Sequence, residues 1–279
     1  MNSQASKTWF ITGCSSGFGR VLAEEALKRG DRVALTARDP STLTSLVAAY
    51  PSIARAWALD VTNVARIKEV LADVEATLAP IDIAVNNAGF VAVGAIEELG
   101  PEQYRPVFET NFFGALEVTR NVLPFMRQRR SGWIVNISAL GGLVANGGLG
   151  YYCASKHAME AVSEAVAEEV APLGIKVLIV EPGQFRTDAM AKRFEADHID
   201  DYETLLAPLR SRFASLDGKQ PGDPKRAAQA IFAALEAEPQ AFRLPLGKDA
   251  LTRIRAKIAR LTVDMDRWEQ TALSTDFAE

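Results

Sequence analysis

The sequence predicts an α/β fold with a doubly wound parallel sheet of about seven strands flanked by helices. Short runs rich in Val and Ile alternate with longer amphipathic segments along the chain. These runs show little polar alternation, as expected of strands buried on both faces of a parallel sheet. A glycine-rich turn follows the first run directly and opens the first amphipathic segment. Repeated β-then-α order requires right-handed crossovers, which build such a sheet.

Seven segments have the length and composition of these strands. They are Trp9–Thr12, Arg32–Thr36, Ala54–Leu59, Ile83–Asn86, Trp133–Ser138, Lys176–Val180 and Phe242–Leu246. Helices are marked between them by their end signals: Gly30 ends one, Thr62 is expected to cap the next, and Pro172 ends a third. Their expected bounds are Val21–Arg29, Asn63–Leu78 and Val162–Ala171.

The chain of 279 residues suits one large α/β domain, and no repeat, linker or low-complexity tract divides it. We therefore expect a single domain over residues 1–279. The segment 184–223 breaks the strand–helix rhythm and ends in glycines and prolines, which indicates a substrate lid. Residues 247–279 form a C-terminal extension.

Composition excludes several functional classes. The net charge is −4 and no block of basic residues is present, which argues against nucleic-acid binding. No apolar stretch reaches membrane-spanning length and no signal peptide is recognisable, so we expect a soluble cytoplasmic protein. Cys14 and Cys153 lack metal-ligand spacing, and His157 and His198 lack partners, so no metal site is expected.

The glycine-rich turn reads Thr12-Gly-Cys-Ser-Ser-Gly-Phe-Gly19. Glycines remove side chains where a pyrophosphate must approach the backbone, and the following helix N-terminus supplies N–H groups and positive potential. The alternative is a tight turn without a ligand. The position after the first strand favours a dinucleotide site. The residues expected to line it are Gly13, Ser15, Ser16, Gly17, Phe18 and Gly19.

The end of the second strand indicates which nucleotide binds. An acid there would hold a ribose 2′-hydroxyl, whereas an arginine accommodates a 2′-phosphate. Ala37 stands where the acid is expected and Arg38 follows it, although Asp39 also lies within reach of a ribose. We expect NADP(H), with NAD(H) as the alternative.

Tyr152 and Lys156 are spaced to lie on one helix face. A phenol titrates near ~10, and a neighbouring ammonium should lower that pKa, so that Tyr152 acts as a general acid or base. Upstream, Ser138 ends a strand and is expected to hydrogen-bond the reacting oxygen. The alternative is a surface helix with a chance match.

The ordered set of the glycine turn, Asn86-Asn-Ala-Gly89, Asn111, Ser138, Tyr152 and Lys156 resembles the short-chain dehydrogenase/reductase family, with a Rossmann-type fold, from about Lys7 to Thr187. The resemblance implies that Tyr152 is the acid/base, Lys156 tunes it and holds the nicotinamide ribose, and Ser138 binds the substrate oxygen. It implies further roles, in a proton-relay water site for Asn111 and in cofactor binding for Asp60, Val61, Asn87, Ala88, Gly89, Pro182, Gly183 and Thr187.

One residue departs from the family pattern. Family members often carry the catalytic serine at the second position of a Ser-Ser pair, which is Ala139 here. In a regular strand Ser138 would then face the opposite side, unless a bulge restores it. Tyr151 is an alternative partner for Ser138 but lacks the four-residue spacing to Lys156.

The leading hypothesis is an NADP(H)-dependent oxidoreductase that acts on a ketone, aldehyde or secondary alcohol. Similarity to retinol and hydroxysteroid dehydrogenases favours a bulky, lipophilic small-molecule substrate. The alternatives are a catalytically silent nucleotide-sensing regulatory protein, an NAD-linked alcohol dehydrogenase, and a sugar-nucleotide epimerase or dehydratase, which the glycine spacing disfavours.

The C-terminal extension carries Leu251, Ile254, Ile258 and Leu261 at helical spacing. We expect an amphipathic helix that docks over the edge of the last strand and protects it. Members of the family that the chain resembles often pair through the edge of the last strand, which a docked helix would cover. They also pair through two long helices, which here would contain Asn111–Met126 and Tyr152–Ala171. A homodimer with a two-fold interface is therefore expected.

Overall fold

A single seven-stranded parallel sheet forms the centre of the protein. The computed structural model describes residues 6–187, 194–196, 198–216 and 218–277. The strand order is β3-β2-β1-β4-β6-β7-β9, and every neighbouring pair is parallel. The strands are β1 (Thr8–Ile11), β2 (Arg32–Ala37), β3 (Ala54–Ala58), β4 (Ile83–Asn86), β6 (Gly132–Ile137), β7 (Ile175–Pro182) and β9 (Arg243–Leu246). The predicted fold class is confirmed, with each predicted strand displaced by two residues or fewer at either end.

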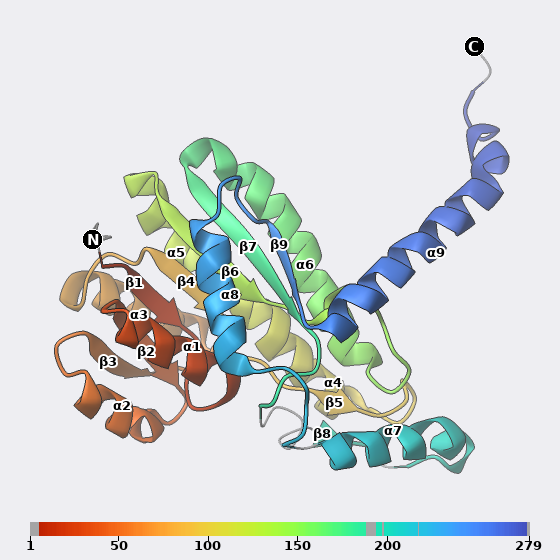
Figure 1. The fold of residues 1–279 in the computed structure, drawn as a ribbon, viewed down its shortest axis with the longest axis horizontal. Helices are drawn as coiled ribbons and strands as arrows, with labels where there is room; N and C mark the ends of the chain where they lie inside the picture. The colour runs from red at the N-terminus through yellow and green to blue at the C-terminus, as the bar shows by residue number, and fades with distance from the viewer. Residues whose placement is uncertain (1–5, 188–193, 197, 217, 278–279) are drawn as a thin grey trace.

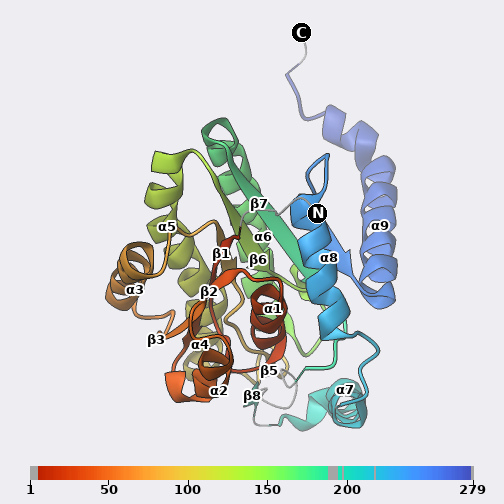
Figure 2. The same ribbon diagram turned by 60° about the vertical axis from the view of Figure 1, so that its left-hand side comes forward.

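Helices cover both faces of this sheet (Figures 1 and 2). One face carries α1 (Gly17–Lys28) and α8 (Pro224–Glu236), and the other carries α3 (Val64–Thr77), α5 (Ala115–Arg129) and α6 (Gly150–Val170). The shorter helices are α2 (Thr44–Ala49) and α4 (Pro101–Phe108), and a π-helical segment, Glu109–Gly114, joins α4 to α5. The predicted N-cap Thr62 is wrong: α3 is capped by the Asn63 side chain, which accepts from the backbone N–H of Arg66 at 3.0 Å.

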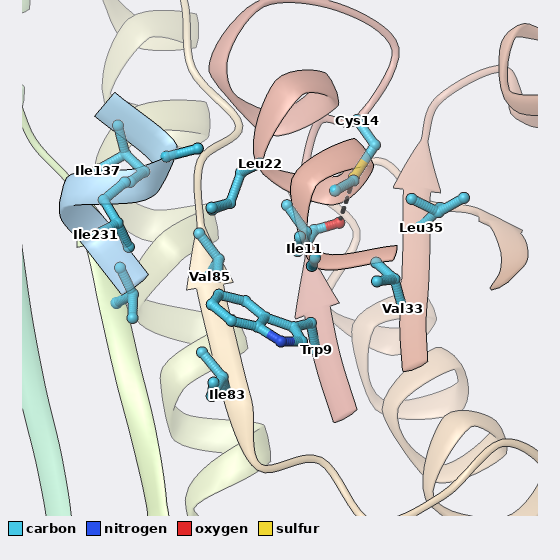
Figure 3. Close-up of a cluster of buried hydrophobic side chains, with 14 of the residues drawn as sticks. Trp9, Ile11, Cys14, Leu22, Val33, Leu35, Ile83, Val85, Ile137 and Ile231 are labelled. Carbon is cyan, nitrogen blue, oxygen red and sulfur yellow. Dashed lines mark hydrogen bonds between the residues drawn. The ribbon is translucent and has the colours of Figure 1, made fainter. Parts of the chain in front are cut away.

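The strand side chains alternate between two hydrophobic clusters. Trp9 and Ile11 of β1 point to the α1/α8 face, whereas Phe10 points to the α3/α5 face. Figure 3 shows the first cluster, in which the Trp9 ring lies on the face of the sheet near Ile83 and Val85 of β4, and Ile231 of α8 belongs to the same cluster. Burial on both faces explains why the strands read as continuous apolar runs.

The chain leaves β1 towards β2 and β3, and then returns to place β4 on the other side of β1. The connections on the two sides of β1 therefore diverge at the carboxyl ends of β1 and β4. Ligands of doubly wound sheets bind at such a switch point. The glycine-rich turn lies at this point, between β1 and α1.

The predicted lid segment contains the short strand β8 (Phe194–Glu195) and the helix α7 (Glu203–Leu216). Strand β8 pairs with β5 (Ala92–Val93) in a separate two-stranded sheet. This small sheet and α7 lie beside the carboxyl ends of the central strands (Figure 1). The described parts of the segment lie at the edge of the sheet where a ligand is expected, and its role as a substrate lid stays a prediction; residues 188–193, 197 and 217 of the segment lie outside the described residues.

The predicted C-terminal helix is confirmed as α9 (Lys248–Leu273), but the predicted docking over the edge of β9 is wrong. Only Ala250 and Ile254 of α9 are buried. The rest of the helix projects away from the body of the protein (Figure 1).

Candidate active site

The turn between β1 and α1 brings the backbone close to the end of β4. Gly13 and Gly17 have φ angles of +72° and +61°, in the left-handed region that favours glycine. A Cβ on Gly19 would overlap the side-chain amide of Asn87 and lie 2.6 Å from the Gly13 carbonyl oxygen. The turn and the first turn of α1 also contain Ser15, Ser16 and Phe18. Bare backbone at a helix N-terminus is suited to binding a pyrophosphate.

Thr12 fixes the neighbouring end of β4. Its Oγ1 accepts hydrogen bonds from the backbone N–H groups of Asn87 at 2.9 Å and Ala88 at 3.0 Å. The Asn87 amide in turn donates to the carbonyl oxygen of Thr12 at 2.8 Å. The segment that the sequence predicted to lie beside a cofactor is thus held against the glycine turn. Sequence reasoning gave Thr12 no role, although it opens the glycine motif.

Asn111 is fully buried in the π-helical segment. Its side-chain oxygen accepts from the Phe90 N–H at 2.9 Å, and its amide donates to the Phe90 carbonyl at 3.0 Å and to Ser155 Oγ at 3.2 Å. A Cβ on Gly89 would lie 2.9 Å from Asn111 Oδ1 and 3.6 Å from Lys156 Nζ. The predicted residues Gly89, Asn111 and Lys156 therefore converge, and π-helical turns are frequent at functional sites.

Tyr152 and Lys156 lie one turn apart near the start of α6. The Lys156 side chain is 4% exposed, and its Nζ donates to the carbonyl oxygen of Ile137, at the end of β6, at 2.7 Å. The loop after β6 closes against the tyrosine, because a Cβ on Gly141 would lie 3.2 Å from Tyr152 Cε1. Tyr151 points elsewhere: its hydroxyl donates to the Ile96 carbonyl at 3.1 Å and its ring stacks on Tyr104.

Burial shifts both titrations. It lowers the pKa of Lys156 to about 8, against the opposing influence of the Glu160 carboxylate. It raises the pKa of the Tyr152 phenol above its ordinary value, and Cys153 adds to the rise. The expected lowering of the Tyr152 pKa is therefore not found in the structure. A phenol in this environment keeps its proton at neutral pH.

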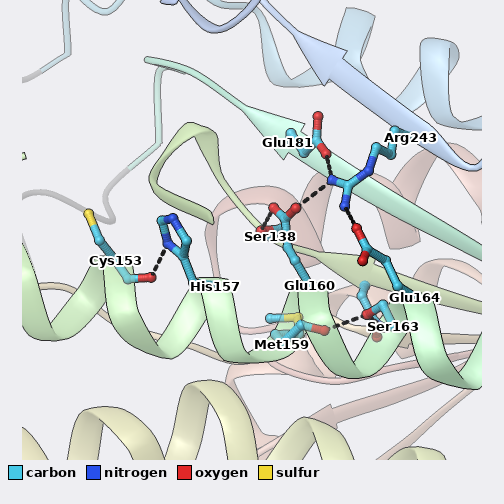
Figure 4. Close-up of polar contacts among 10 residues, drawn as sticks. Ser138, Cys153, His157, Met159, Glu160, Ser163, Glu164, Glu181 and Arg243 are labelled. Atoms are coloured by element: carbon cyan, nitrogen blue, oxygen red, sulfur yellow. Dashed lines mark hydrogen bonds and ion pairs between the residues drawn. The ribbon is translucent and has the colours of Figure 1, made fainter. Parts of the chain in front are cut away.

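Ser138 belongs to a charged network that runs from the buried Glu160 and Glu181 to the exposed Glu164 (Figure 4). Its hydroxyl donates to Glu160 Oε1 at 2.5 Å. The Arg243 guanidinium of β9 binds Glu160, Glu164 and Glu181. Burial raises the pKa of Glu181, and the charge of Glu160 adds to the rise. Sequence reasoning missed Glu160 and Arg243, and the Ser138 hydroxyl is directed to this network.

The end of β2 presents one unpaired cation. Arg38 is exposed, and within the described residues its guanidinium forms no hydrogen bond or ion pair. The neighbouring Asp39 carboxylate accepts from the Ser41 N–H at 2.9 Å and caps a short 3-10 helix. At the end of β3, Asp60 accepts from the N–H and hydroxyl of Thr62, and Val61 is buried beside Gly114.

The end of β7 forms the side of the candidate cofactor site that is opposite the end of β2. Gly183 N–H donates to the Leu246 carbonyl at 2.9 Å, and Gln184 N–H donates to Asp249 Oδ2 at 2.8 Å. A Cβ on Gly183 would overlap the Asp249 carboxylate. Pro182 is buried, and Thr187 follows where the described segment ends. The first turn of α9 therefore holds this side of the site in place.

Comparison with known proteins decides the family. A family model described as short chain dehydrogenase matches residues 7–198. The chain belongs to the short-chain dehydrogenase family. It is 32% identical over 272 residues to Oxidoreductase BOA17 of Botryotinia fuckeliana (strain B05.10), which covers 96% of this chain and 99% of that protein. It is 40% identical over 182 residues to human Retinol dehydrogenase 5, which covers 64% of this chain and 56% of that protein.

The solved structures agree with this assignment. A short-chain dehydrogenase from Streptomyces avermitilis superposes with a TM-score of 0.92 at 45% sequence identity, covering 98% of this chain and 100% of that one. The short-chain dehydrogenase described here is accordingly an oxidoreductase that uses NAD(P).

The residues present fit a dinucleotide. The glycine turn carries no side chain at Gly13, Gly17 or Gly19, so its backbone is bare at the start of α1, and the exposed Arg38 at the end of β2 adds a positive charge. Among the described residues, no group of three or more His, Cys, Asp and Glu side chains is placed to hold a metal ion. In the described part of this short-chain dehydrogenase, no helix is long and apolar enough to cross a membrane.

Proposed function

We propose that this short-chain dehydrogenase is an NADP(H)-linked reductase of a bulky, apolar ketone or aldehyde, able to run in reverse on the secondary or primary alcohol. The observation that carries the proposal is the environment of Tyr152. Its ring packs in one apolar cluster with Val91, Val93, Leu149, Leu209 and Phe213. Tyr152 is thus a proton donor set in an apolar wall, of which two residues come from the lid helix α7.

Tyr152 is the proton carrier in this proposal. Its phenol stays protonated at neutral pH because burial raises its pKa, so it donates from Oη to a carbonyl oxygen, and in reverse it takes the proton from an alcohol. Bound nicotinamide supplies or accepts the hydride. Lys156 lies one helical turn after Tyr152 on α6, and its ammonium donates a hydrogen bond to the Ile137 carbonyl oxygen.

Most of the remaining predicted residues are assigned to binding the dinucleotide cofactor. The glycine turn and the Asn87–Gly89 segment are assigned to the pyrophosphate and its surroundings, and Asp60 and Val61 to the adenine side. Pro182, Gly183 and Thr187 are assigned to the nicotinamide side. The Asn111 side chain is hydrogen-bonded to the Phe90 backbone and to the Ser155 hydroxyl, so we assign Asn111 to holding these two residues in place beside Lys156.

Arg38 supports the choice of NADP(H). An unpaired guanidinium binds a phosphate bidentately, whereas a ribose hydroxyl would require an acid at this strand end. Asp39 is the nearby acid, and its carboxylate already caps a helix. NAD(H) remains the alternative cofactor.

The apolar character of the proposed substrate has two supports. The cluster around Tyr152 joins side chains of β5, the loop before α6, and α7. One relative carries retinol in its name. We therefore assign a lipophilic carbonyl compound of larger size than a short-chain ketone.

A catalytically silent nucleotide sensor is the second candidate. It is favoured by Ala139, which leaves no hydroxyl at the usual family position, and by the engagement of Ser138 with Glu160. The intact Tyr152–Lys156 pair favours the enzyme. The experiment is a panel of small ketones, long-chain aldehydes, retinal and steroid ketones, with NADPH or NADH oxidation followed by absorbance. Turnover of the large carbonyls with NADPH supports the proposal; cofactor binding without turnover on any of them supports the sensor.

A further inference from the structure

The helix α9 leaves the body of the protein after one anchored turn. Ala250 and Ile254 pack against Leu140, with Leu143 and Val144 beside them. From residue 258 to residue 277 every residue is exposed. Figure 1 shows this part of α9 extending into solvent well clear of the sheet and its covering helices.

The projecting part carries a stripe of large apolar side chains. Ile258, Leu261, Met265 and Trp268 are 58%, 45%, 64% and 59% exposed. Their spacing alternates between three and four residues, which continues the spacing of Leu251 and Ile254. This is the repeat of a coiled-coil seam, whose residues are buried by a partner helix. A helix of this kind gains most of its stability from packing of its apolar face.

Charges along α9 are divided between its two halves. Residues 253–260 contain Arg253, Arg255, Lys257 and Arg260 and no acid. Residues 264–269 contain Asp264, Asp266 and Glu269, with one arginine. An antiparallel copy of the same helix would place the acidic half of each chain beside the basic half of the other. A parallel copy would place like halves together.

We propose that α9 is a dimerisation arm that pairs with α9 of a second copy of this chain in an antiparallel, two-fold coiled coil. The exposed stripe suits a register in which the two-fold axis crosses the helix pair at the level of residue 263, whose own side chain lies outside the stripe. Ile258 then packs against the partner's Trp268, and Leu261 against the partner's Met265. This register leaves Ile254 on its own body. It also brings Arg255 across from the partner's Glu269 on both sides of the two-fold axis.

Three features support a second copy as the occupant. The stripe and the charge order are both self-complementary, as an isologous interface requires. An anionic lipid surface would be repelled by Asp264, Asp266 and Glu269, which are interspersed with the apolar residues. The interface is small, so we expect a dissociation constant on the order of micromolar.

The test is sedimentation-velocity centrifugation of the full chain over a range of concentrations. Met265→Asp should weaken self-association at least about tenfold, since it introduces a charge into the seam. Val263→Asp is the matched control, because Val263 is also 64% exposed on α9 but lies outside the stripe. It should leave self-association within about twofold of wild type. Met265 and Val263 are both remote from the buried core, so neither variant should unfold the protein.

Charge reversal tests the antiparallel direction. Arg255→Glu alone and Glu269→Arg alone should each weaken the dimer, and the double variant should restore it. A wild-type chain that is monomeric at all concentrations overturns the proposal. So does a dimer that Met265→Asp leaves unchanged, which would place the interface elsewhere, for example on α5 and α6. Binding of the monomer to anionic vesicles without self-association would overturn it in favour of a membrane.

Discussion

At the scale of single residues, burial of the Lys156 ammonium lowers the free energy of unfolding by a measurable amount. Its ammonium is 4% exposed and its pKa falls to about 8 from an ordinary value of 10.5. Between these two pH values the unfolded chain binds a proton that the folded protein does not. Stability therefore rises with pH across this window, and below pH 8 the full cost of burying the charge is present.

Comparison with Lys156→Met isolates this effect, because the variant lacks the titrating group. The unfolding free energy of the wild type relative to the variant should increase from pH 8 towards pH 10, by at most about 1.4 kcal/mol per pH unit. Urea denaturation of both ligand-free proteins measures it. A difference that stays constant over this range would show that Lys156 titrates normally.

Arg38 is the residue on which the cofactor assignment depends. Arg38→Ala should raise the Michaelis constant for NADPH by about tenfold or more, since a charge-assisted contact is lost, and should change that for NADH little. Initial-rate kinetics with both cofactors measure it. Arg127→Ala is the control, because Arg127 is exposed in the last turn of α5. Equal effects of Arg38→Ala on both cofactors would remove the proposed 2′-phosphate contact.

Ser138 and Ala139 test how the site works without the usual serine. Ser138→Ala should lower stability by about 1–3 kcal/mol, because Glu160 loses a buried donor, and should leave most of kcat. Ala139→Ser should raise kcat by about tenfold, since it adds a donor for the reacting oxygen. Thermal denaturation and steady-state kinetics measure the pair. A large loss of kcat in Ser138→Ala at unchanged stability would show that Ser138 takes part in catalysis.

These residues also mark the limit of sequence reasoning about the site. The four-residue spacing of Tyr152 and Lys156 is local, so it could be read directly. The direction of the Ser138 hydroxyl is set by Glu160, 22 residues away, and by Arg243, 83 residues beyond Glu160 in sequence. No local pattern connects these three residues. The pKa of Tyr152 was misjudged for the same reason, since it depends on burial.

At the scale of elements, the strands were predictable from the residue pattern, because two-sided burial leaves an apolar run that is visible in sequence. By contrast, α4 was not predicted, and α5 was expected only from the family resemblance, as part of a helix containing Asn111–Met126. Both helices contain an internal proline, Pro106 and Pro124, and a π-helical segment joins them. Strands β5 and β8 have two residues each, too few to show a period. The start of α1 at Gly17 was missed because glycine is a poor helix former.

The helix α7 is expected to contact a bulky substrate. Leu209 contacts the apolar cluster that contains Tyr152. Leu209→Ala should raise the Michaelis constant for a bulky apolar carbonyl by about tenfold and leave that for a small ketone nearly unchanged, because only the larger substrate reaches α7. Thr204→Ala, at an exposed position of the same helix, is the control. Equal effects of Leu209→Ala on large and small substrates would place α7 away from the substrate.

At the scale of the whole molecule, the strand order brings distant segments to one place. The carboxyl ends of the parallel strands β1, β4, β6 and β7 lie along one edge of the sheet, where Lys156 of α6 is hydrogen-bonded to the end of β6. Alternating β and α elements predicted this arrangement, since right-handed crossovers leave few alternatives. The course of α9 was not predictable, because an amphipathic pattern shows that a helix needs a partner without showing which partner it has.

The central claim is that Tyr152 supplies the proton while hydride passes between cofactor and carbonyl carbon. The direct measurement is single-turnover reduction of a large ketone with NADPH deuterated at the transferring position, followed by mass spectrometry of the alcohol. The wild type should place one deuterium on the carbinol carbon. Tyr152→Phe should bind cofactor normally and form product at least about 10³-fold more slowly. Product without deuterium, or an equal rate in Tyr152→Phe, would contradict the account.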